Sequence, residues 1–230
     1  MRDILAIVAG IVLLGFAGEV RSAETTDDQL IKECTDALEK NPKDAALYAK
    51  RAEAYARKGL QENAVKDYSV AIALDSKNSY FFNGRANVYR EKKDCDKAIT
   101  DYTQAIELNA SNAHFFNGRA ECYRETRKYD KAIADYTQAI KLDASNAYFF
   151  NSRAESYKKT EKHDLAVADY TQAIKLNDHN TYFFLGRAES YRATGKLKEA
   201  LADMQKSSEL GFPDPEYLKS KIAEIRSEMK

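Results

Sequence analysis

A six-residue motif recurs along this chain at a constant interval of 34 residues. The motif DYTQAI begins at residues 101, 135 and 169. A second motif keeps the same interval, as FFNGRA at residues 81 and 115, FFNSRA at 149 and FFLGRA at 183. A fixed period of this length is typical of repeat proteins, in which each unit packs against its neighbours and together they bury one continuous core. With the divergent copies LYAKRA at 47 and DYSVAI at 67, we predict five repeats, at residues 45–78, 79–112, 113–146, 147–180 and 181–214.

Each repeat contains two apolar stripes with helical spacing. In the second repeat the first stripe is Phe82, Ala86 and Tyr89, and the second is Ala98, Tyr102 and Ala105. Steps of four and three residues place such side chains on one face of an α-helix, and a polar turn separates the two stripes. The sequence therefore predicts an all-α chain in which every repeat is a helix, a turn and a second helix.

The residues at fixed positions of the repeat resemble the tetratricopeptide repeat (TPR) family, which has small residues at positions 8, 20 and 27 and aromatic residues at 4, 11 and 24. Position 8 is Ala52, Ala86, Ala120, Ala154 and Ala188, and position 11 is Tyr55, Tyr89, Tyr123, Tyr157 and Tyr191. Position 24 is Tyr68, Tyr102, Tyr136, Tyr170 and, in the last repeat, Met204. The resemblance implies a right-handed α-solenoid that binds a protein or peptide in its concave groove, without catalysis or cofactor.

Position 15 departs from the family pattern in the middle repeats. The family usually has Gly there, because the backbone at that helix end favours the left-handed region. The outer repeats have Gly59 and Gly195, whereas the inner ones have Lys93, Arg127 and Glu161. If the backbone is the same in all five repeats, we expect roughly 1 kcal/mol of strain at each of those three residues.

Two charged rows run through all five repeats. Position 7 is always arginine, namely Arg51, Arg85, Arg119, Arg153 and Arg187. Position 23 is always aspartate, namely Asp67, Asp101, Asp135, Asp169 and Asp203. An anion-binding ladder of arginines is one interpretation, but the one-to-one match favours structural ion pairs between the two helices of each repeat.

The repeats are flanked by two segments that are suited to cover the ends of a solenoid. Residues 24–44 contain Leu30, Cys34 and Ala37 in the phase of a second helix, which predicts a half-repeat. Residues 215–230 follow Asp214, a helix-capping residue, and begin with Pro215. The apolar stripe Leu218, Ile222, Ile225 and Met229 predicts a closing helix.

Residues 1–23 are interpreted as a signal peptide. The uncharged apolar stretch from Ile4 to Gly18 is short for a membrane span, which needs about 20 residues, and it follows Arg2. Cleavage after residue 17, 22 or 23 remains open. The expected location is the periplasm of a bacterium, and the alternative is an inner-membrane anchor formed by residues 4–18.

Composition excludes several functions. Lys plus Arg and Asp plus Glu each number 36, so no net charge attracts nucleic acid, and no nucleophile, metal or nucleotide motif occurs. The three cysteines, Cys34, Cys95 and Cys122, lack paired spacing. We interpret Cys122 as a buried apolar residue, and the redox state of all three stays open.

The resemblance implies that positions 2, 5, 9 and 12 of the first helix line the binding groove. The predicted contacts are Tyr80, His114, Tyr148 and Tyr182 at position 2, Asn83, Asn117 and Asn151 at position 5, Asn87, Glu121 and Glu155 at position 9, and Arg90, Arg124, Lys158 and Arg192 at position 12. A row of amides can donate to and accept from the backbone of an extended peptide. Recent duplication of the repeat would produce the same regularity without a function.

The sequence therefore predicts a non-enzymatic scaffold or adaptor of the cell envelope that binds a peptide or a partner subunit of unknown identity. Two alternatives stay open. One is a regulatory or substrate-presenting subunit of an envelope enzyme complex, and the other is a homo-oligomer formed by repeats that stack between chains.

Overall fold

The computed structural model describes residues 26–230, and this part of the chain forms twelve α-helices without a strand. The predicted signal peptide lies outside the described residues. The first helices of the five repeats are α2 (Ala45–Arg57), α4 (Ser79–Glu91), α6 (Ala113–Glu125), α8 (Ala147–Lys159) and α10 (Thr181–Ala193). The second helices are α3 (Gln61–Leu74), α5 (Cys95–Leu108), α7 (Tyr129–Leu142), α9 (His163–Leu176) and α11 (Leu197–Glu209). Before and after them lie α1 (Asp27–Lys40) and α12 (Pro215–Glu228).

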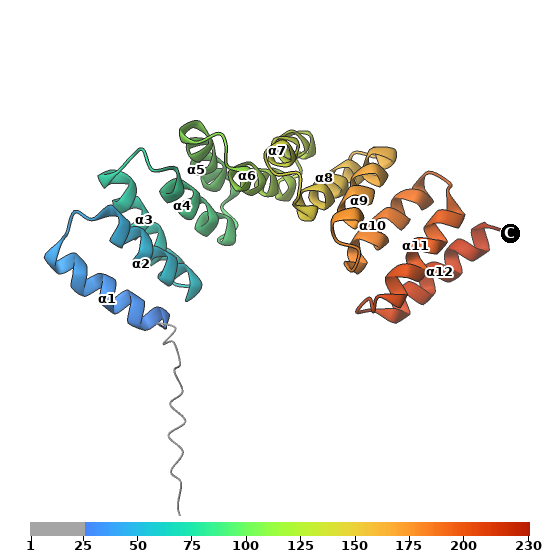
Figure 1. Cartoon of the computed structure of the whole chain (residues 1–230), viewed down its shortest axis with the longest axis horizontal. Helices are drawn as coiled ribbons and strands as arrows, with labels where there is room; N and C mark the ends of the chain where they lie inside the picture. Colours follow the sequence, from blue (N-terminus) through green and yellow to red (C-terminus); the bar gives the residue numbers. More distant parts are fainter. Residues whose placement is uncertain (1–25) are drawn as a thin grey trace, which may run out of the picture.

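The helices form an arch in which each one packs against the next along the chain (Figure 1). First helices of neighbouring repeats also meet, as α2 with α4, α4 with α6 and α8 with α10. In the described part of the chain, second helices make no comparable contact with one another. The first helices therefore line the inner side of the curve, and the all-α solenoid predicted from the sequence is confirmed.

Asparagine at the last position of the repeat starts each of four first helices. Its side-chain oxygen accepts a hydrogen bond from the backbone N–H two residues later, over 3.0–3.1 Å. The four capping residues are Asn78, Asn112, Asn146 and Asn180. A cap of this kind stabilises a helix by about 1 kcal/mol relative to alanine.

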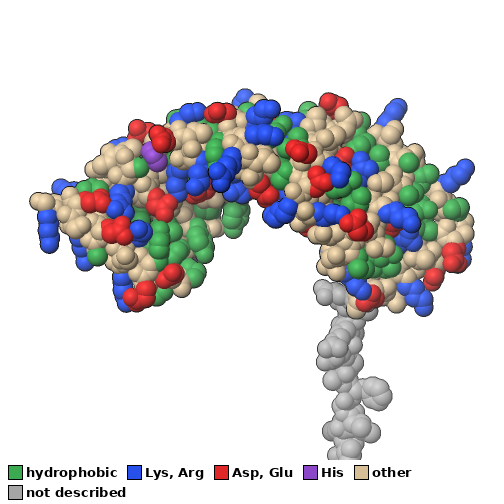
Figure 2. Space-filling model, turned by 180° about the vertical axis from the view of Figure 1, so that it is seen from behind, with side chains coloured by type: hydrophobic (Ala, Val, Ile, Leu, Met, Phe, Trp, Pro, Cys, Tyr) green, Lys and Arg blue, Asp and Glu red, His purple; other side chains and the backbone are tan. Residues whose placement is uncertain are grey.

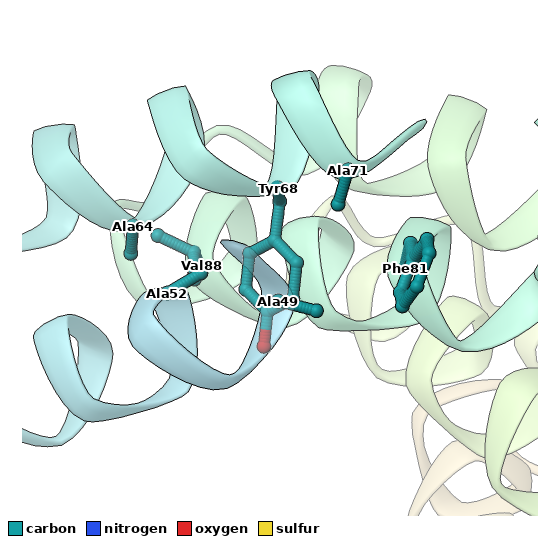
Figure 3. Close-up of a cluster of buried hydrophobic side chains, with 7 residues drawn as sticks. All are labelled: Ala49, Ala52, Ala64, Tyr68, Ala71, Phe81 and Val88. Carbon is teal, nitrogen blue, oxygen red and sulfur yellow. The ribbon is translucent and has the colours of Figure 1, made fainter. Parts of the chain in front are cut away.

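The core consists of tyrosine rings packed between small residues. In the first interface, Tyr68 of α3 lies among Ala49 and Ala52 of α2 and Val88 of α4 (Figure 3). The same arrangement recurs with Tyr102, Tyr136 and Tyr170, each of which is fully buried. For Tyr68, Tyr102 and Tyr170, glycine at position 6 of the next repeat makes room for the ring, and a Cβ on Gly118 would lie 2.5 Å from the Tyr102 ring. The repeat after Tyr136 has Ser152 at this position.

The two end helices cover the outermost repeats. Leu218 and Ile225 of α12 are buried against the last repeat, together with Met204. The predicted apolar stripe is wrong at Met229, which follows the end of α12 and is 41 % exposed. Among residues 26–230, none of the helices combines the length and apolarity that crossing a bilayer requires.

The chain keeps the left-handed turn at position 15 in all five repeats. Gly59 and Gly195 have φ of 73° and 75°, and Lys93, Arg127 and Glu161 have φ of 63°, 58° and 58°. A residue with a Cβ in this left-handed conformation destabilises the fold by roughly 1–2 kcal/mol. Glycine would remove this strain, but it loses more backbone entropy on folding, which cancels about 0.5–1 kcal/mol of the gain.

We expect the triple variant Lys93→Gly, Arg127→Gly and Glu161→Gly to be more stable than the wild type by about 1.5–3 kcal/mol, because each substitution removes the backbone strain of one turn. Urea denaturation followed by circular dichroism measures the difference. The matched control is Gly195→Ala, which introduces only backbone strain, since no atom lies within 4 Å of the added Cβ. That control should lose about 1 kcal/mol. A triple variant no more stable than the wild type would contradict the strain.

Candidate functional site

The two charged rows meet as five bidentate ion pairs. In each pair the arginine Nε donates to one carboxylate oxygen over 2.6–2.7 Å, and Nη2 donates to the other over 2.7–3.0 Å. The pairs are Arg51–Asp67, Arg85–Asp101, Arg119–Asp135, Arg153–Asp169 and Arg187–Asp203. The aspartate side chains are only 6–9 % exposed. Hydrogen bonding to Asp101 raises the pKa of the Arg85 guanidinium, so the cation is held in its charged form.

A third row, which sequence reasoning missed, completes this joint. Nη1 of each arginine donates over 2.9–3.1 Å to a hydroxyl on the helix before it, which is the second helix of the preceding repeat or, for Arg51, α1. The hydroxyls belong to Thr35, Ser69, Thr103, Thr137 and Thr171. The signal was available, because Ser or Thr recurs at position 25 of the repeat. Each arginine thus joins three helices, and all three of its nitrogens are bound within the chain.

The buried tyrosines reach through the core to position 9 on the concave side. The Tyr102 hydroxyl donates to Asn87 Oδ1 over 2.6 Å, and Tyr136 donates to Glu121 Oε1 over 2.5 Å. Tyr170 makes the same bond to Glu155. Burial raises the pKa of all three phenols, so they remain protonated donors at neutral pH. Hydrogen bonds from the core tyrosines therefore fix the side chains at position 9 in these three repeats.

Positions 9 and 12 form ion pairs in the last three repeats. Arg124 Nε donates to Glu121 over 3.2 Å within the third repeat. Lys158 binds Glu155 at 3.3 Å and, across the repeat boundary, Glu189 at 2.5 Å. Burial disfavours the charge on Lys158, but these two carboxylates raise its pKa.

The closing helix α12 extends this ion-pair network. The sequence analysis predicted the helix but not its contacts with the groove. Arg192 Nη1 donates to Glu224 over 2.8 Å and Arg192 Nε to Glu228 over 3.2 Å. The Tyr217 hydroxyl donates to Glu189 over 3.3 Å. The four-residue spacing of the two glutamates places both on one helix face, which is the feature of the sequence that could have indicated their role.

The row at position 2 is exposed and aromatic. Tyr80, Tyr148 and Tyr182 are 60 %, 60 % and 56 % exposed, and His114 occupies the same place in the third repeat. Each ring lies edge to face against a phenylalanine of the following repeat or, for Tyr182, against Phe212, with centroids 5.3–5.9 Å apart. The contact fixes one side of each ring and leaves the other free.

The asparagine row at position 5 is available for hydrogen bonding. Asn83, Asn117 and Asn151 lie half-buried on successive first helices. Within residues 26–230, their side-chain amides make no hydrogen bond to the rest of the chain. This is unusual in a structure where the neighbouring polar rows are paired.

Two hollows show how the rows come together. Asn151, Glu155 and Lys158 of the fourth repeat line a hollow of about 360 Å³ with Tyr182 and Glu189 of the fifth. A hollow of about 510 Å³ follows between α10 and α12, lined by Arg192, Tyr217 and Glu228 among others. In the space-filling view, charged side chains of both signs line the space under the arch, and apolar ones gather toward its C-terminal end (Figure 2). The concave side is therefore a mixed polar and aromatic groove.

Candidate metal ligands and cysteines were two further features to place in the structure. In the part of the chain that the structure describes, no group of three His, Cys, Asp or Glu side chains is placed to hold a metal ion. Cys34, Cys95 and Cys122 are buried and unbridged. Burial raises the pKa of the Cys122 thiol to about 12, which keeps it protonated.

The fold and the repeat pattern agree with known proteins. The crystal structure of YrrB, a TPR protein with an unusual peptide-binding site, superposes with a TM-score of 0.73 at 19 % identity, over 83 % of this chain and 98 % of that one. The crystal structure of the MamA protein gives 0.69 at 18 %, over 72 % and 91 %. MamA from Desulfovibrio magneticus RS-1 gives 0.69 at 14 %, over 72 % and 94 %. Identities this low show a shared fold alone.

Curated protein sequences give no match. The model of the tetratricopeptide repeat family, in contrast, matches residues 34–79, 83–147 and 151–209, which together make up most of the chain. These stretches include the alanine and tyrosine rows that form the core, the Arg–Asp pairs and most of the groove positions, whereas Tyr80 and Tyr148 fall between the matched stretches. The chain belongs to the tetratricopeptide repeat family.

Proposed function

We propose that this protein is a non-enzymatic interaction scaffold that holds an extended peptide segment of a partner protein in its concave groove. The observation that supports this most directly is the row of free amides at Asn83, Asn117 and Asn151. An amide that is half-buried on a helix and has no partner can donate to a backbone carbonyl and accept from a backbone N–H. A row of such groups, one per repeat, suits a ligand with a regular backbone.

The aromatic row supports the same proposal. Tyr148 and Tyr182 each keep one free ring face or edge, because the other side lies against a phenylalanine. Fixed aromatic side chains bind apolar groups at low entropic cost. Tyr182 also shares its hollow with Asn151, so aromatic and amide groups act on the same stretch of ligand. One protein of this fold, YrrB, is described by its peptide-binding site.

The test removes the amides without altering the core. In the triple variant Asn83→Ala, Asn117→Ala and Asn151→Ala, we expect peptide affinity to fall about tenfold or more, since each lost amide leaves backbone groups of the ligand unpaired. Peptides selected from a random library displayed on phage serve as ligands, and fluorescence anisotropy measures their dissociation constants.

The matched control removes three amides from the outer side of the arch. The exposed residues Gln104, Gln138 and Gln172 occupy position 26 of their repeats and lie on the second helices α5, α7 and α9. Their replacement by alanine should leave affinity unchanged. Equal affinity of the groove variant and the wild type, with equal thermal unfolding, would remove the asparagine row from the function and favour duplication as its origin.

We also propose that the scaffold acts in the cell envelope. This rests on the apolar stretch from Ile4 to Gly18 and the charged residues after it. The intact mass of the wild-type protein purified for the binding experiment distinguishes the alternatives. A chain that begins after residue 17, 22 or 23 agrees with export and cleavage, and a chain that begins at Met1 indicates a retained anchor.

A further inference from the structure

The groove charges are neutralised within the chain in the last three repeats. Glu121 pairs with Arg124, Lys158 lies between Glu155 and Glu189, and Arg192 is held by two glutamates of α12. In the third and fourth repeats, the cation at position 12 thus receives its carboxylate from position 9, one helical turn earlier. Positions 9 and 12 of the second repeat can be compared with this pairing.

The second repeat lacks that carboxylate. Asn87 stands at position 9, and Arg90 at position 12 has no Asp or Glu within ion-pair distance in residues 26–230. The Tyr102 hydroxyl donates to Asn87 Oδ1 over 2.6 Å, just as Tyr136 donates to Glu121. The oxygen of Asn87 is therefore occupied and its NH₂ group is left as a donor. Arg90 follows Asn87 by three residues on α4, so the two side chains lie on the same face of that helix. The positive charge of Arg90 opposes the rise in the pKa of Tyr102 that burial causes.

A second difference from the other repeats lies next to Arg90, at position 2 of the third repeat. The hollow between the fourth and fifth repeats is lined by positions 5, 9 and 12 of one repeat and positions 2, 5 and 9 of the next. The equivalent positions between the second and third repeats include His114, where other repeats have tyrosine, and Asn117. The first departure removes a carboxylate from this part of the groove, and the second replaces a phenol by an imidazole, whose ring nitrogens can form hydrogen bonds. Glu121, the remaining carboxylate there, is bound to Arg124 and Tyr136.

We propose that Asn87, Arg90, His114 and Asn117 form a subsite for the carboxylate of an Asp or Glu side chain of the bound peptide. This inference rests on the proposed function and names the chemistry of the ligand. The ligand carboxylate takes the place that the Glu121 carboxylate takes in the third repeat, where it accepts from the cation at position 12. An arginine with its fork of N–H donors is well suited to this contact, and the neighbouring amides add further donors.

The test uses peptides displayed on phage through their C-terminal end, so that no free terminal carboxylate is present. We expect the wild type to select sequences with Asp or Glu at one fixed place. A selected peptide is then synthesised with an amidated C-terminus and titrated by fluorescence anisotropy. Arg90→Gln should weaken its binding about tenfold or more, because the carboxylate loses its charged partner.

The sharper variant is Asn87→Glu, which supplies an internal carboxylate as in the third and fourth repeats. It should also weaken binding about tenfold or more, because the added side chain occupies Arg90 and repels the ligand. Its thermal unfolding should match the wild type, since Tyr102 can donate to glutamate as Tyr136 does. Controls for the change in net charge are Lys141→Gln and Gln138→Glu, both on exposed positions of α7, and neither should change affinity.

The possible outcomes separate the two proposals. Selection of peptides with no acidic residue at a fixed place, or full binding by Asn87→Glu, would overturn the subsite and leave the groove function intact. Selection of no peptide at all by the wild type would overturn both.

Discussion

Replacing Arg153 by alanine is expected to lower the free energy of unfolding by about 3–5 kcal/mol, because the carboxylate of Asp169 would remain buried without its cation. In the native chain this carboxylate accepts from Nε and Nη2 over 2.7 Å each, and its side chain is 7 % exposed. The variant also leaves the Thr137 hydroxyl without its donor from the next repeat. Three helices, α7, α8 and α9, therefore lose one common joint.

The loss in Arg153→Ala should depend on pH in a defined direction. Burial raises the pKa of Asp169, and the guanidinium of Arg153 opposes this rise. Without Arg153 the folded-state pKa rises further above the unfolded value, so stability is retained at low pH and is lost as the pH increases through that pKa. Urea denaturation at about pH 4 and about pH 7 should show the larger deficit at pH 7.

Two further variants make this prediction specific. Lys206→Ala removes one partner of an exposed pair with Glu209, and should cost less than about 0.5 kcal/mol. Replacing Arg153 and Asp169 together by leucine should recover most of the loss, because a buried ion pair can often be replaced by apolar residues of similar size. A single Arg153→Ala variant as stable as the wild type at pH 7 would contradict the structural role of the row.

Replacing Tyr136 by alanine is expected to cost about 3–5 kcal/mol, the range measured when a large aromatic residue is removed from a core. The ring is fully buried and packs against Ala120, Ala132 and Tyr123. The two alanines are too small to fill the cavity, and all three neighbours belong to helices that are packed against the adjoining helices of the solenoid. Because repeats stabilise one another only through their interfaces, the unfolding transition should also become less cooperative.

Tyr136→Phe separates packing from hydrogen bonding at this site. It keeps the ring and removes only the hydroxyl that donates to Glu121 over 2.5 Å. Since Glu121 is partly exposed and still bound by Arg124, the expected cost is about 1 kcal/mol. Guanidinium denaturation of both variants measures the difference, and equal losses would mean that the hydroxyl, and not the ring, holds the interface.

Much of the fold follows from local properties of the sequence. The spacing of Phe82, Ala86 and Tyr89 decides that the segment is a helix with one apolar face, whatever surrounds it. The asparagine before four of the first helices, the aspartate before α2 and the left-handed residue after each first helix set where these helices begin and end. Because these signals recur every 34 residues, the sequence predicts the number of units as well as their type. The Arg and Asp rows were also recognisable, since each pair lies 16 residues apart within one repeat.

The candidate site was predicted less completely. The sequence indicates that Glu155 and Lys158 are neighbours on one helix, but Lys158 binds Glu189 of the next repeat more closely, at 2.5 Å against 3.3 Å. Contacts of α12 with Arg192 were missed for the same reason. They depend on how far each repeat is rotated and shifted relative to the next, which no local pattern specifies.

The sequence by itself determined the units of this protein, because helix periodicity, caps and the packing of alanine against tyrosine all act over fewer than 34 residues. The tertiary structure decided which groups those units leave without partners. Stacking brings each arginine at position 7 to a hydroxyl of the preceding repeat, joins Lys158 to Glu189 and closes the groove on α12. The same stacking leaves the amide row and Arg90 open. The distances between side chains of neighbouring repeats depend on how the repeats stack. Those distances decide which side chains are paired within the chain and which remain free to bind a ligand.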